Sequence, residues 1–196
     1  MTNFESLDTV KRDKIINAAF KEFRYGYKKA STDVIVREAG ISKGLLFHYF
    51  DTKAKFFNYL VGYAVDVLLK DCIEMFDQGQ RDILEGVWQL ALLKKDVLDR
   101  YPYIYDFING LYAHGDDSPN GEYVPELYTK KSQAMMENIY ANCDRGLLRD
   151  DIDHKKAIDI TFFTASYAFD EGDQNYEAFL ERLKGYLDVF RKCFYK

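Results

Sequence analysis

The sequence predicts an all-α protein in which three short N-terminal helices precede a body of longer helices. Apolar residues recur at intervals of three and four along most of the 196 residues. Serine, threonine and glycine stand where helices are expected to begin and end. No segment shows the strict alternation of apolar and polar residues that is typical of a strand. With 47% hydrophobic residues, the chain is long enough to bury one or two cores.

The first helix is predicted over about residues 10–25. Its apolar residues recur at i, i+3, i+4 and i+7, which is the stripe of an amphipathic helix: Ile16, Ala19, Phe20 and Phe23. Gly26 follows and is expected to end it.

Two more short helices are predicted directly afterwards. Thr32 is expected to cap a helix over residues 33–39, and Gly40 then stands where a helix commonly ends with a left-handed residue. Ser42 is expected to cap a third helix that ends near Phe50. Short helices joined by a tight turn that contains glycine, with a longer helix before them, describe a helix-turn-helix.

The rest of the chain also shows helical patterns. Thr52 is expected to cap a helix that runs to about Phe76 and links the head to the body. Further helices are predicted over residues 81–95, 102–114, 122–146, 153–172 and 175–195. Residues 115–121, GDDSPNG, are dense in turn formers and are predicted to form a loop.

The third helix is predicted to have one buried and one exposed face. At 100° per residue, Leu46 and Phe50 share a face that suits packing on the first helix. Gly44 and His48 then point the opposite way, with Leu45 and Phe47 on the flanks. A glycine on an exposed face lets the backbone approach a surface closely, and the DNA major groove accepts a helix.

Polar residues around this helix suit a phosphate backbone. Hydroxyls and free N–H groups at helix starts favour anions, and lysines add positive charge. The residues concerned are Thr32, Ser42, Lys43, His48, Tyr49, Lys53 and Lys55. Phosphate contacts set the register of a protein on DNA but carry no sequence information. The alternative is a small helical subdomain with solvated lysines.

Charge is divided unevenly along the chain. Residues 1–60 hold eleven Lys and Arg against seven Asp and Glu, a net charge of +4, although the whole chain has a net charge of −5. A basic head on an acidic body indicates a polyanion as the partner of the head. Chance clustering of lysines is the alternative.

Residues 31–57, STDVIVREAGISKGLLFHYFDTKAKFF, resemble the N-terminal DNA-binding signature of the TetR family of bacterial transcriptional repressors. The family pattern has a Thr cap, a short Ile-Ala helix, Ala-Gly-Val-Ser, a recognition helix ending in aromatic-x-His/Tyr-Phe, and a Lys-led helix. The resemblance covers about residues 10–57. It implies a DNA-binding domain over residues 1–52 and a helical ligand-sensing and dimerisation domain over residues 53–196.

The resemblance also implies roles for individual residues. It implies phosphate contacts from Thr32, Ser42, His48 and Lys53. It implies groove contacts near Lys43, Gly44 and Leu45. Two positions depart from the pattern: Leu45 stands where a small or polar residue is frequent, and Phe47 where Tyr is frequent. Leu45 can touch a thymine methyl but cannot hydrogen-bond a base edge, so we expect a changed operator rather than lost DNA binding.

The helical body is expected to form a homodimer. The last helix carries Leu180, Leu183, Leu187, Phe190 and Phe194 in a 3-4-3-4 seam. The helix before it carries small residues at helical spacing: Ala157, Thr161, Ala165 and Ala168. Two such helices from each subunit would form a four-helix interface and place two recognition helices on a near-palindromic operator. The alternative is that both stripes face the core of one subunit.

The helical body is also expected to contain a ligand pocket. Aromatic residues that suit a lipophilic or aromatic small-molecule effector are Trp88, Tyr103, Phe107, Tyr112, Phe163 and Tyr167. Asp106 and Asp170 lie near them in sequence and would help to hold a hydrophobic cation. Aromatics at helical spacing also fill ordinary cores, which is the alternative for each of them. Release of DNA on ligand binding would make the protein a ligand-responsive repressor.

Other classes of protein fit the sequence less well. Gly-rich phosphate loops, His-Glu-x-x-His and Gly-x-Ser-x-Gly motifs are missing, and the three histidines lack metal-ligand spacing, so we expect no enzyme, metal or cofactor. Cys72, Cys143 and Cys193 are scattered, which indicates ordinary residues of a cytoplasmic protein. No apolar run reaches the length of a membrane-spanning helix, so we expect no membrane partner. The rival is a helical homodimer that serves as a carrier or scaffold without specific DNA binding.

Overall fold

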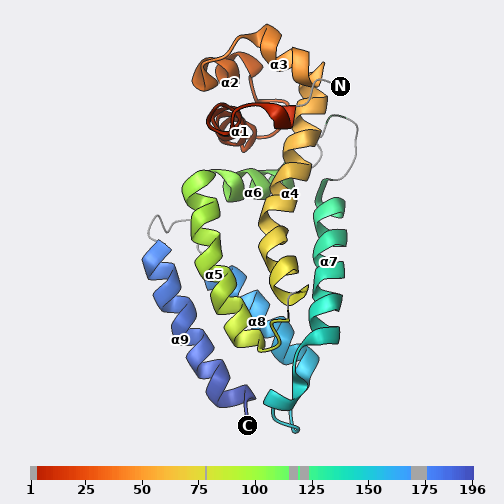
Figure 1. The fold of residues 1–196 in the computed structure, drawn as a ribbon, viewed down its shortest axis with the longest axis vertical. Coiled ribbons are helices and arrows are strands. Elements are labelled where there is room, and N and C mark those ends of the chain that lie inside the picture. The colour runs from red at the N-terminus through yellow and green to blue at the C-terminus, as the bar shows by residue number, and fades with distance from the viewer. Residues whose placement is uncertain (1–3, 78, 115–118, 120–123, 169–175) are drawn as a thin grey trace. The chain divides into compact units, whose positions relative to one another are not determined.

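A computed structural model describes residues 4–77, 79–114, 119, 124–168 and 176–196. Within these residues every regular element is a helix, which confirms the predicted all-α class, and one isolated bridge pairs Leu148 with Tyr195. The helices are η1 (Phe4–Ser6), α1 (Thr9–Phe23), α2 (Thr32–Ala39), α3 (Lys43–Phe50), α4 (Lys53–Asp77), α5 (Ile83–Arg100), α6 (Ile104–Ala113), α7 (Val124–Asn142), η3 (Arg145–Leu147), α8 (His154–Ala168) and α9 (Tyr176–Phe194) (Figure 1). The loop predicted at residues 115–121 lies outside the described residues except for residue 119.

The chain divides into two compact units. The first unit comprises Met1–Leu68 and Val97–Lys130, and the second comprises Leu69–Asp96 and Lys131–Lys196. The helices α4 and α5 each contribute to both units. None of the described helices combines the length and the apolar composition that crossing a membrane requires.

The first unit is built on the apolar stripe of α1. All four predicted stripe residues have no exposed surface, and α1 packs against both α2 and α6. The ring of Phe20 lies 4.9 Å from that of Phe107 on α6, and the ring of Phe23 lies 5.1 Å from that of Phe57 on α4. Aromatic ring contacts therefore hold α1 against α6 and against the first turns of α4.

The helix caps confirm most of the predicted boundaries. Gly40 ends α2 with φ 66°, and the Ser42 side chain accepts a hydrogen bond from the Leu45 amide at 3.1 Å at the start of α3. The Thr52 hydroxyl caps α4 in the same way, through the Lys55 amide at 3.1 Å. The prediction for Thr32 was wrong by one residue: Thr32 is already helical and Ser31 is the cap residue.

The junction between α3 and α4 is an unusual turn. Asp51 has φ 58° and ψ −48°, and the Thr52 amide donates to the Phe50 carbonyl at 2.6 Å. A hydrogen bond to the second residue back, with positive φ between, is a γ-turn of the rare and strained kind. The Asp51 backbone therefore stores strain directly after α3.

We expect Asp51→Gly to raise the free energy of unfolding by about 1 kcal/mol, because glycine adopts positive φ without a Cβ clash. The ion pair of Asp51 with Lys55 is exposed on both sides and contributes little stability. Urea unfolding followed by circular dichroism measures the change. The control is Asp51→Ala, which loses the ion pair without relief of strain; equal stability of the two variants would contradict the assignment.

The second unit has its own apolar core, formed largely by α5, α8 and α9. The helices α8 and α9 pack against each other, and α5 contacts both (Figure 1). Its buried residues are Ile83, Leu84, Val87, Leu90, Ala91, Ile139, Ile158, Phe179, Leu183 and Leu187. At the end of α9, the Tyr195 hydroxyl donates to Asp82 at 2.6 Å and thereby ties the C-terminal turn to the start of α5.

Candidate functional site

The short helix α3 has the two faces that its sequence predicts. Leu46 is fully buried and Phe50 is nearly so, whereas Lys43, Gly44 and His48 are exposed. The flanking residues Leu45 and Phe47 are half-buried. The exposed residues Lys43, Gly44 and His48, together with the half-buried Phe47 beside them, form what we call the outer face of α3.

Gly44 has no packing role inside the protein. A Cβ atom placed on it would meet only the Ser42 hydroxyl, at 4.0 Å, which is ordinary van der Waals distance. Its φ also lies outside the positive region, so the backbone does not require glycine there. Since helices lose roughly 0.5–1 kcal/mol for an internal glycine, the lack of a side chain at the outer face is unexplained by folding.

Lys43 forms an exposed ion pair with the start of α2. Its ammonium lies 2.9 Å from the carboxylate of Asp33, and both side chains are at least half exposed. Asp33 directly follows Thr32, the first residue of α2. Exposed ion pairs are weak, so the Lys43 ammonium can exchange this partner for a phosphate at small cost in free energy.

The base of α3 is supported by a residue that sequence reasoning missed. Phe4, which is only 5% exposed, lies 4.8 Å from Phe50, 5.5 Å from Tyr49 and 5.3 Å from Tyr59 between ring centroids. Tyr49 is therefore half-buried against η1 on one side. The only signal in the sequence was a lone aromatic residue in a polar N-terminal segment.

Lys53, at the start of α4, points back into the first unit. Its ammonium donates hydrogen bonds to the carbonyl oxygens of Tyr27 and Ala30, at 2.5 and 2.7 Å. The same group lies 4.4 Å from the centre of the Tyr27 ring. Burial lowers the pKa of Lys53, and the nearby Glu22 carboxylate partly opposes this effect.

The helices α1 and α6 meet closely in the first unit. Gly110 on α6 is buried, and an added Cβ would lie 3.0 Å from the carbonyl carbon of Arg24 at the end of α1. Beside this contact, the Arg24 guanidinium pairs with Asp106 at 3.0 Å and lies 4.9 Å from the centre of the Tyr103 ring. Asp106, which was expected to help to hold a cationic ligand, is thus engaged by Arg24.

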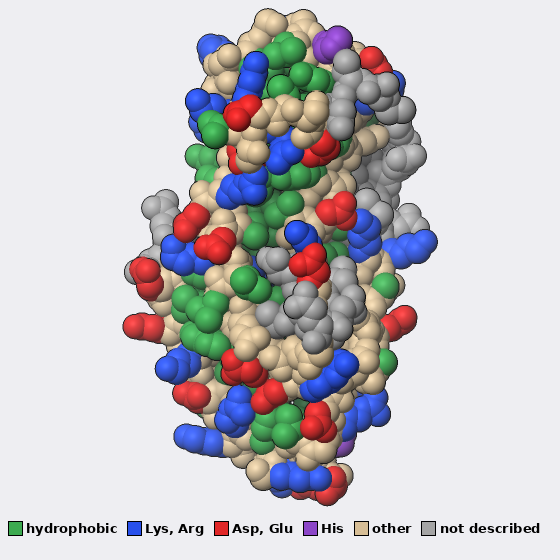
Figure 2. All heavy atoms as spheres, viewed as in Figure 1, with side chains coloured by type: hydrophobic (Ala, Val, Ile, Leu, Met, Phe, Trp, Pro, Cys, Tyr) green, Lys and Arg blue, Asp and Glu red, His purple; other side chains and the backbone are tan. Residues whose placement is uncertain are grey.

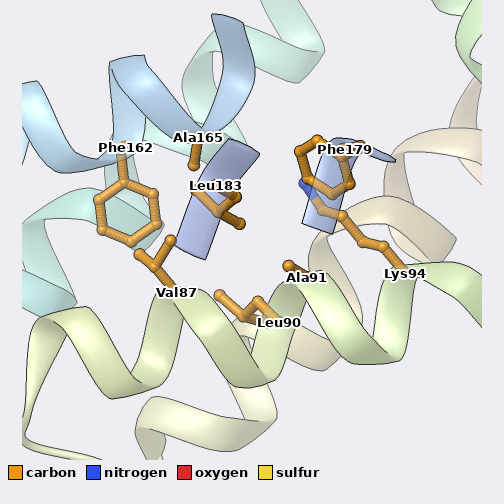
Figure 3. A pocket seen from close by; sticks show the side chains of 8 residues that line it. All are labelled: Val87, Leu90, Ala91, Lys94, Phe162, Ala165, Phe179 and Leu183. Atoms are coloured by element: carbon orange, nitrogen blue, oxygen red, sulfur yellow. The ribbon is translucent and has the colours of Figure 1, made fainter. Parts of the chain in front are cut away.

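The second unit contains a small apolar cavity between α5, α8 and α9. Its volume is about 50 Å³. Side chains from α8 and α9 point towards α5, and the Lys94 side chain extends towards Phe179 (Figure 3). The lining residues are Val87, Leu90, Ala91, Lys94, Phe162, Ala165, Phe179 and Leu183.

None of the five predicted ligand residues whose side chains the structure describes lines this cavity. Tyr103, Phe107 and Tyr112 belong to the first unit, where Phe107 is fully buried core and Tyr112 is 48% exposed. Trp88 packs on the core of the second unit, and Phe163 is 74% exposed. The side chain of Tyr167, like Asp170, lies outside the described residues.

The predicted dimer residues lie mainly inside one protomer. Ala157, Thr161, Leu183 and Leu187 are buried in the second unit, which is the alternative that the sequence left open. The other described members, Ala165, Leu180 and Phe190, are half-buried against the same core, and the side chain of Ala168 lies outside the described residues. Different apolar residues of these two helices are exposed: Ile160, Phe163, Tyr186 and Val189.

In the part of the chain that the structure describes, no group of three or more His, Cys, Asp or Glu side chains is arranged to hold a metal ion. Lys and Arg side chains lie interspersed with Asp and Glu over the face shown in Figure 2.

Comparison with known proteins shows which family the N-terminal residues match and which solved structures share the fold. Residues 15–60 match the family described as bacterial regulatory proteins, tetR family. No curated protein matches the sequence. Several solved structures share the fold at low sequence identity. Regulatory protein TetR from Rhodobacter sphaeroides is 17% identical, with a TM-score of 0.68 over 95% of this chain and 100% of that chain.

Two further structures show the same likeness. The ketosteroid transcriptional regulator KstR2 of Mycobacterium tuberculosis is 17% identical, with a TM-score of 0.66 over 97% of both chains. The TetR family protein CprB from S. coelicolor A3(2) is 18% identical, with a TM-score of 0.65 over 95% of this chain and 89% of that chain. Residues 15–60 are thus similar to the N-terminal part of the tetR family of bacterial regulatory proteins, and nearly the whole chain shares the fold of these three regulators.

Proposed function

We propose that the protein is a ligand-responsive transcriptional repressor that binds a near-palindromic operator as a homodimer. The observation that carries the proposal is the outer face of α3, where Gly44 is exposed, helical and unneeded for packing. A helix with such a face can enter the major groove until its backbone approaches the bases. The protein then acts by binding rather than by catalysis.

In this proposal the polar residues around α3 hold the DNA backbone. Ser42 and Thr32 stand at helix starts, where N–H groups and hydroxyls bind phosphate oxygens. Lys43 leaves Asp33 for a phosphate, and the exposed His48 donates a hydrogen bond. Leu45 and Phe47 supply apolar contact to thymine methyl groups rather than hydrogen bonds.

The experiment is fluorescence anisotropy with labelled duplex from the region upstream of the gene that encodes the protein, compared with unrelated duplex across a salt series. A specific DNA binder prefers one duplex and loses affinity steeply as salt rises. Lys43→Ala is expected to weaken binding to both. Absence of any salt-dependent binding would refute DNA binding and favour the carrier or scaffold alternative.

We propose that a second copy of the chain covers the exposed apolar residues of α8 and α9. Ile160 and Phe163 are 47% and 74% exposed on α8, and Tyr186 and Val189 are 41% and 53% exposed on α9. Each pair is spaced by three residues and therefore shares a helix face. Two packed helices from each protomer make a four-helix interface, and the two-fold symmetry of such a dimer predicts a near-palindromic operator.

Phe163→Glu is expected to raise the dimer dissociation constant by at least about 100-fold, because it removes a large apolar contact and places a charge in the interface. Sedimentation velocity over a concentration series measures the effect. Val10→Glu is the matched control, since Val10 is 64% exposed on α1. A variant Phe163→Glu that dimerises as well as the control would rule out this interface.

We propose that the effector is lipophilic or aromatic and enters the second unit at the cavity between α5, α8 and α9. The described lining is apolar except for Lys94, but the volume of about 50 Å³ is far below the roughly 300 Å³ of ordinary ligand pockets. An effector must therefore separate these helices, and it releases DNA only if it prefers the separated arrangement. Operator DNA must weaken effector binding by the same factor, which paired titrations test.

A further inference from the structure

Lys53 bridges two segments that are distant in sequence. It is the first residue of α4, directly after the γ-turn that ends α3. Its ammonium bonds to the Tyr27 and Ala30 carbonyl oxygens in the connection between α1 and α2. The start of α4 is therefore tied to the segment that leads into α2.

The bonded ammonium has little left to offer a phosphate. It has three donors, of which two are used by carbonyl oxygens at 2.5 and 2.7 Å. It also lies over the ring of Tyr27 at 4.4 Å and 5.9 Å from the centre of the Phe23 ring. A move towards DNA would leave two carbonyl groups without this donor, in contrast to Lys43, whose partner is an exposed carboxylate.

The segment that Lys53 holds matters for the helix-turn-helix. Residues 24–31 join α1 to α2, and Ser31 at their end donates its amide to the Glu22 carboxylate at 2.9 Å. Lys53 adds a second tie to this connection, at the far end of α3. The two helices of the helix-turn-helix are thus held at both the entrance to α2 and the exit from α3.

We propose that Lys53 is a positioning residue that fixes the orientation of α3, and not a residue that neutralises a DNA phosphate. This inference rests on the proposed function, because it concerns how the same helix is presented to DNA. It replaces the phosphate contact that family resemblance implies for Lys53. It predicts that Lys53 contributes to recognition of the operator without contributing to the count of displaced counterions.

Salt dependence distinguishes the two roles. Each neutralised phosphate contributes about 0.9 to the slope of log affinity against log salt concentration, so removal of a phosphate contact makes the slope shallower by that amount. Such a loss also weakens binding to all sequences about equally. Loss of a positioning residue leaves the slope unchanged and weakens operator binding more than binding to unrelated DNA.

The test compares the wild-type protein with Lys53→Ala, Lys53→Met and Lys43→Ala on operator and unrelated duplexes. Lys53→Met keeps an apolar stem over the Tyr27 and Phe23 rings, and circular dichroism selects the variants that are folded. For Lys53→Ala and Lys53→Met we expect operator affinity about tenfold lower, unrelated-DNA affinity nearly unchanged and an unchanged slope. For Lys43→Ala we expect uniformly weaker binding and a slope shallower by about 0.9.

The outcomes separate this inference from the proposed function. A slope that is shallower in the Lys53 variants by as much as in Lys43→Ala would overturn the positioning role and leave DNA binding intact. Lys53 variants that bind the operator like the wild type would also overturn it. A wild-type protein without salt-dependent DNA binding would overturn the proposed function, and the role of Lys53 in recognition with it.

Discussion

Gly110→Ala is expected to lower the free energy of unfolding by about 3 kcal/mol, because the added methyl group meets backbone rather than a movable side chain. An ideal Cβ on Gly110 would lie 3.0 Å from the carbonyl carbon and 3.2 Å from the Cα of Arg24, and closer still to the carbonyl oxygen. Relief of this overlap requires α6 to withdraw from the end of α1, which would open the aromatic packing of Phe20 on Phe107.

Urea unfolding of both variants, followed by circular dichroism, tests this expectation with Gly62→Ala as the matched control. Gly62 lies within α4 in the same unit, and an added Cβ there would meet no atom within 4 Å. Gly62→Ala is therefore expected to stabilise the protein by roughly 0.5–1 kcal/mol. A Gly110→Ala variant as stable as the wild type would contradict the close contact between α6 and the end of α1.

The same contact has a place in the proposed mechanism. The helix α6 follows α5, and Arg24 at the end of α1 begins the connection to α2. Because the Arg24–Asp106 ion pair and the buried Gly110 join α6 to the end of α1, a shift of α6 would displace the connection that leads into α2. Close-packed contacts of this kind transmit displacements because the interior does not compress.

The helix-turn-helix could be predicted in detail because its signals are local. The Ser42 cap, the left-handed Gly40 and the buried pair of Leu46 and Phe50 each depend on residues within one or two turns. Helical periodicity then gives the exposed face directly. The one misplaced cap, Ser31 in place of Thr32, shifts a helix start by a single residue, which is within the usual uncertainty of helix ends.

The roles of the body residues could not be predicted in the same way. A stripe such as Leu183 and Leu187 shows that a helix face is buried but does not show whether its own core or a second copy buries it. Aromatic content likewise does not separate core from pocket: Phe107 is core, and the cavity in the second unit is lined by aliphatic residues together with Phe162 and Phe179. Four of the lining residues, Val87, Leu90, Ala91 and Lys94, follow the spacing i, i+3, i+4 and i+7, which indicates a shared helix face but not a cavity beside it.

Contacts between distant residues account for the remaining gaps. Lys53 resembles a phosphate-binding lysine in sequence, and only the fold shows that the carbonyl groups of Tyr27 and Ala30 surround its ammonium. Phe4 supports α3 across more than forty residues of chain, through Phe50 and Tyr49. Neither contact has a helical spacing that a pattern could reveal.

Gly44→Leu is expected to lower operator affinity by about 100-fold or more and at the same time to stabilise the fold. Inside the protein the new side chain meets open space, since only the Ser42 hydroxyl lies as near as 4.0 Å to the added Cβ. Leucine is also a better helix former than glycine by roughly 0.8 kcal/mol, so the free energy of unfolding should rise. In the complex, however, the side chain stands between the α3 backbone and the groove, and loss of close contacts worth about 3 kcal/mol follows.

A variant that is more stable but binds the operator more weakly cannot owe its loss of affinity to unfolding. Unfolding in urea and anisotropy on operator duplex are measured on the same preparations, with Gly62→Ala as the control that stabilises the protein without touching the outer face of α3. Gly44→Ala should fall between wild type and Gly44→Leu in affinity, because a single methyl group blocks less of the approach. A Gly44→Leu protein that is stabilised and still binds the operator like the wild type would show that α3 does not bring its backbone close to DNA.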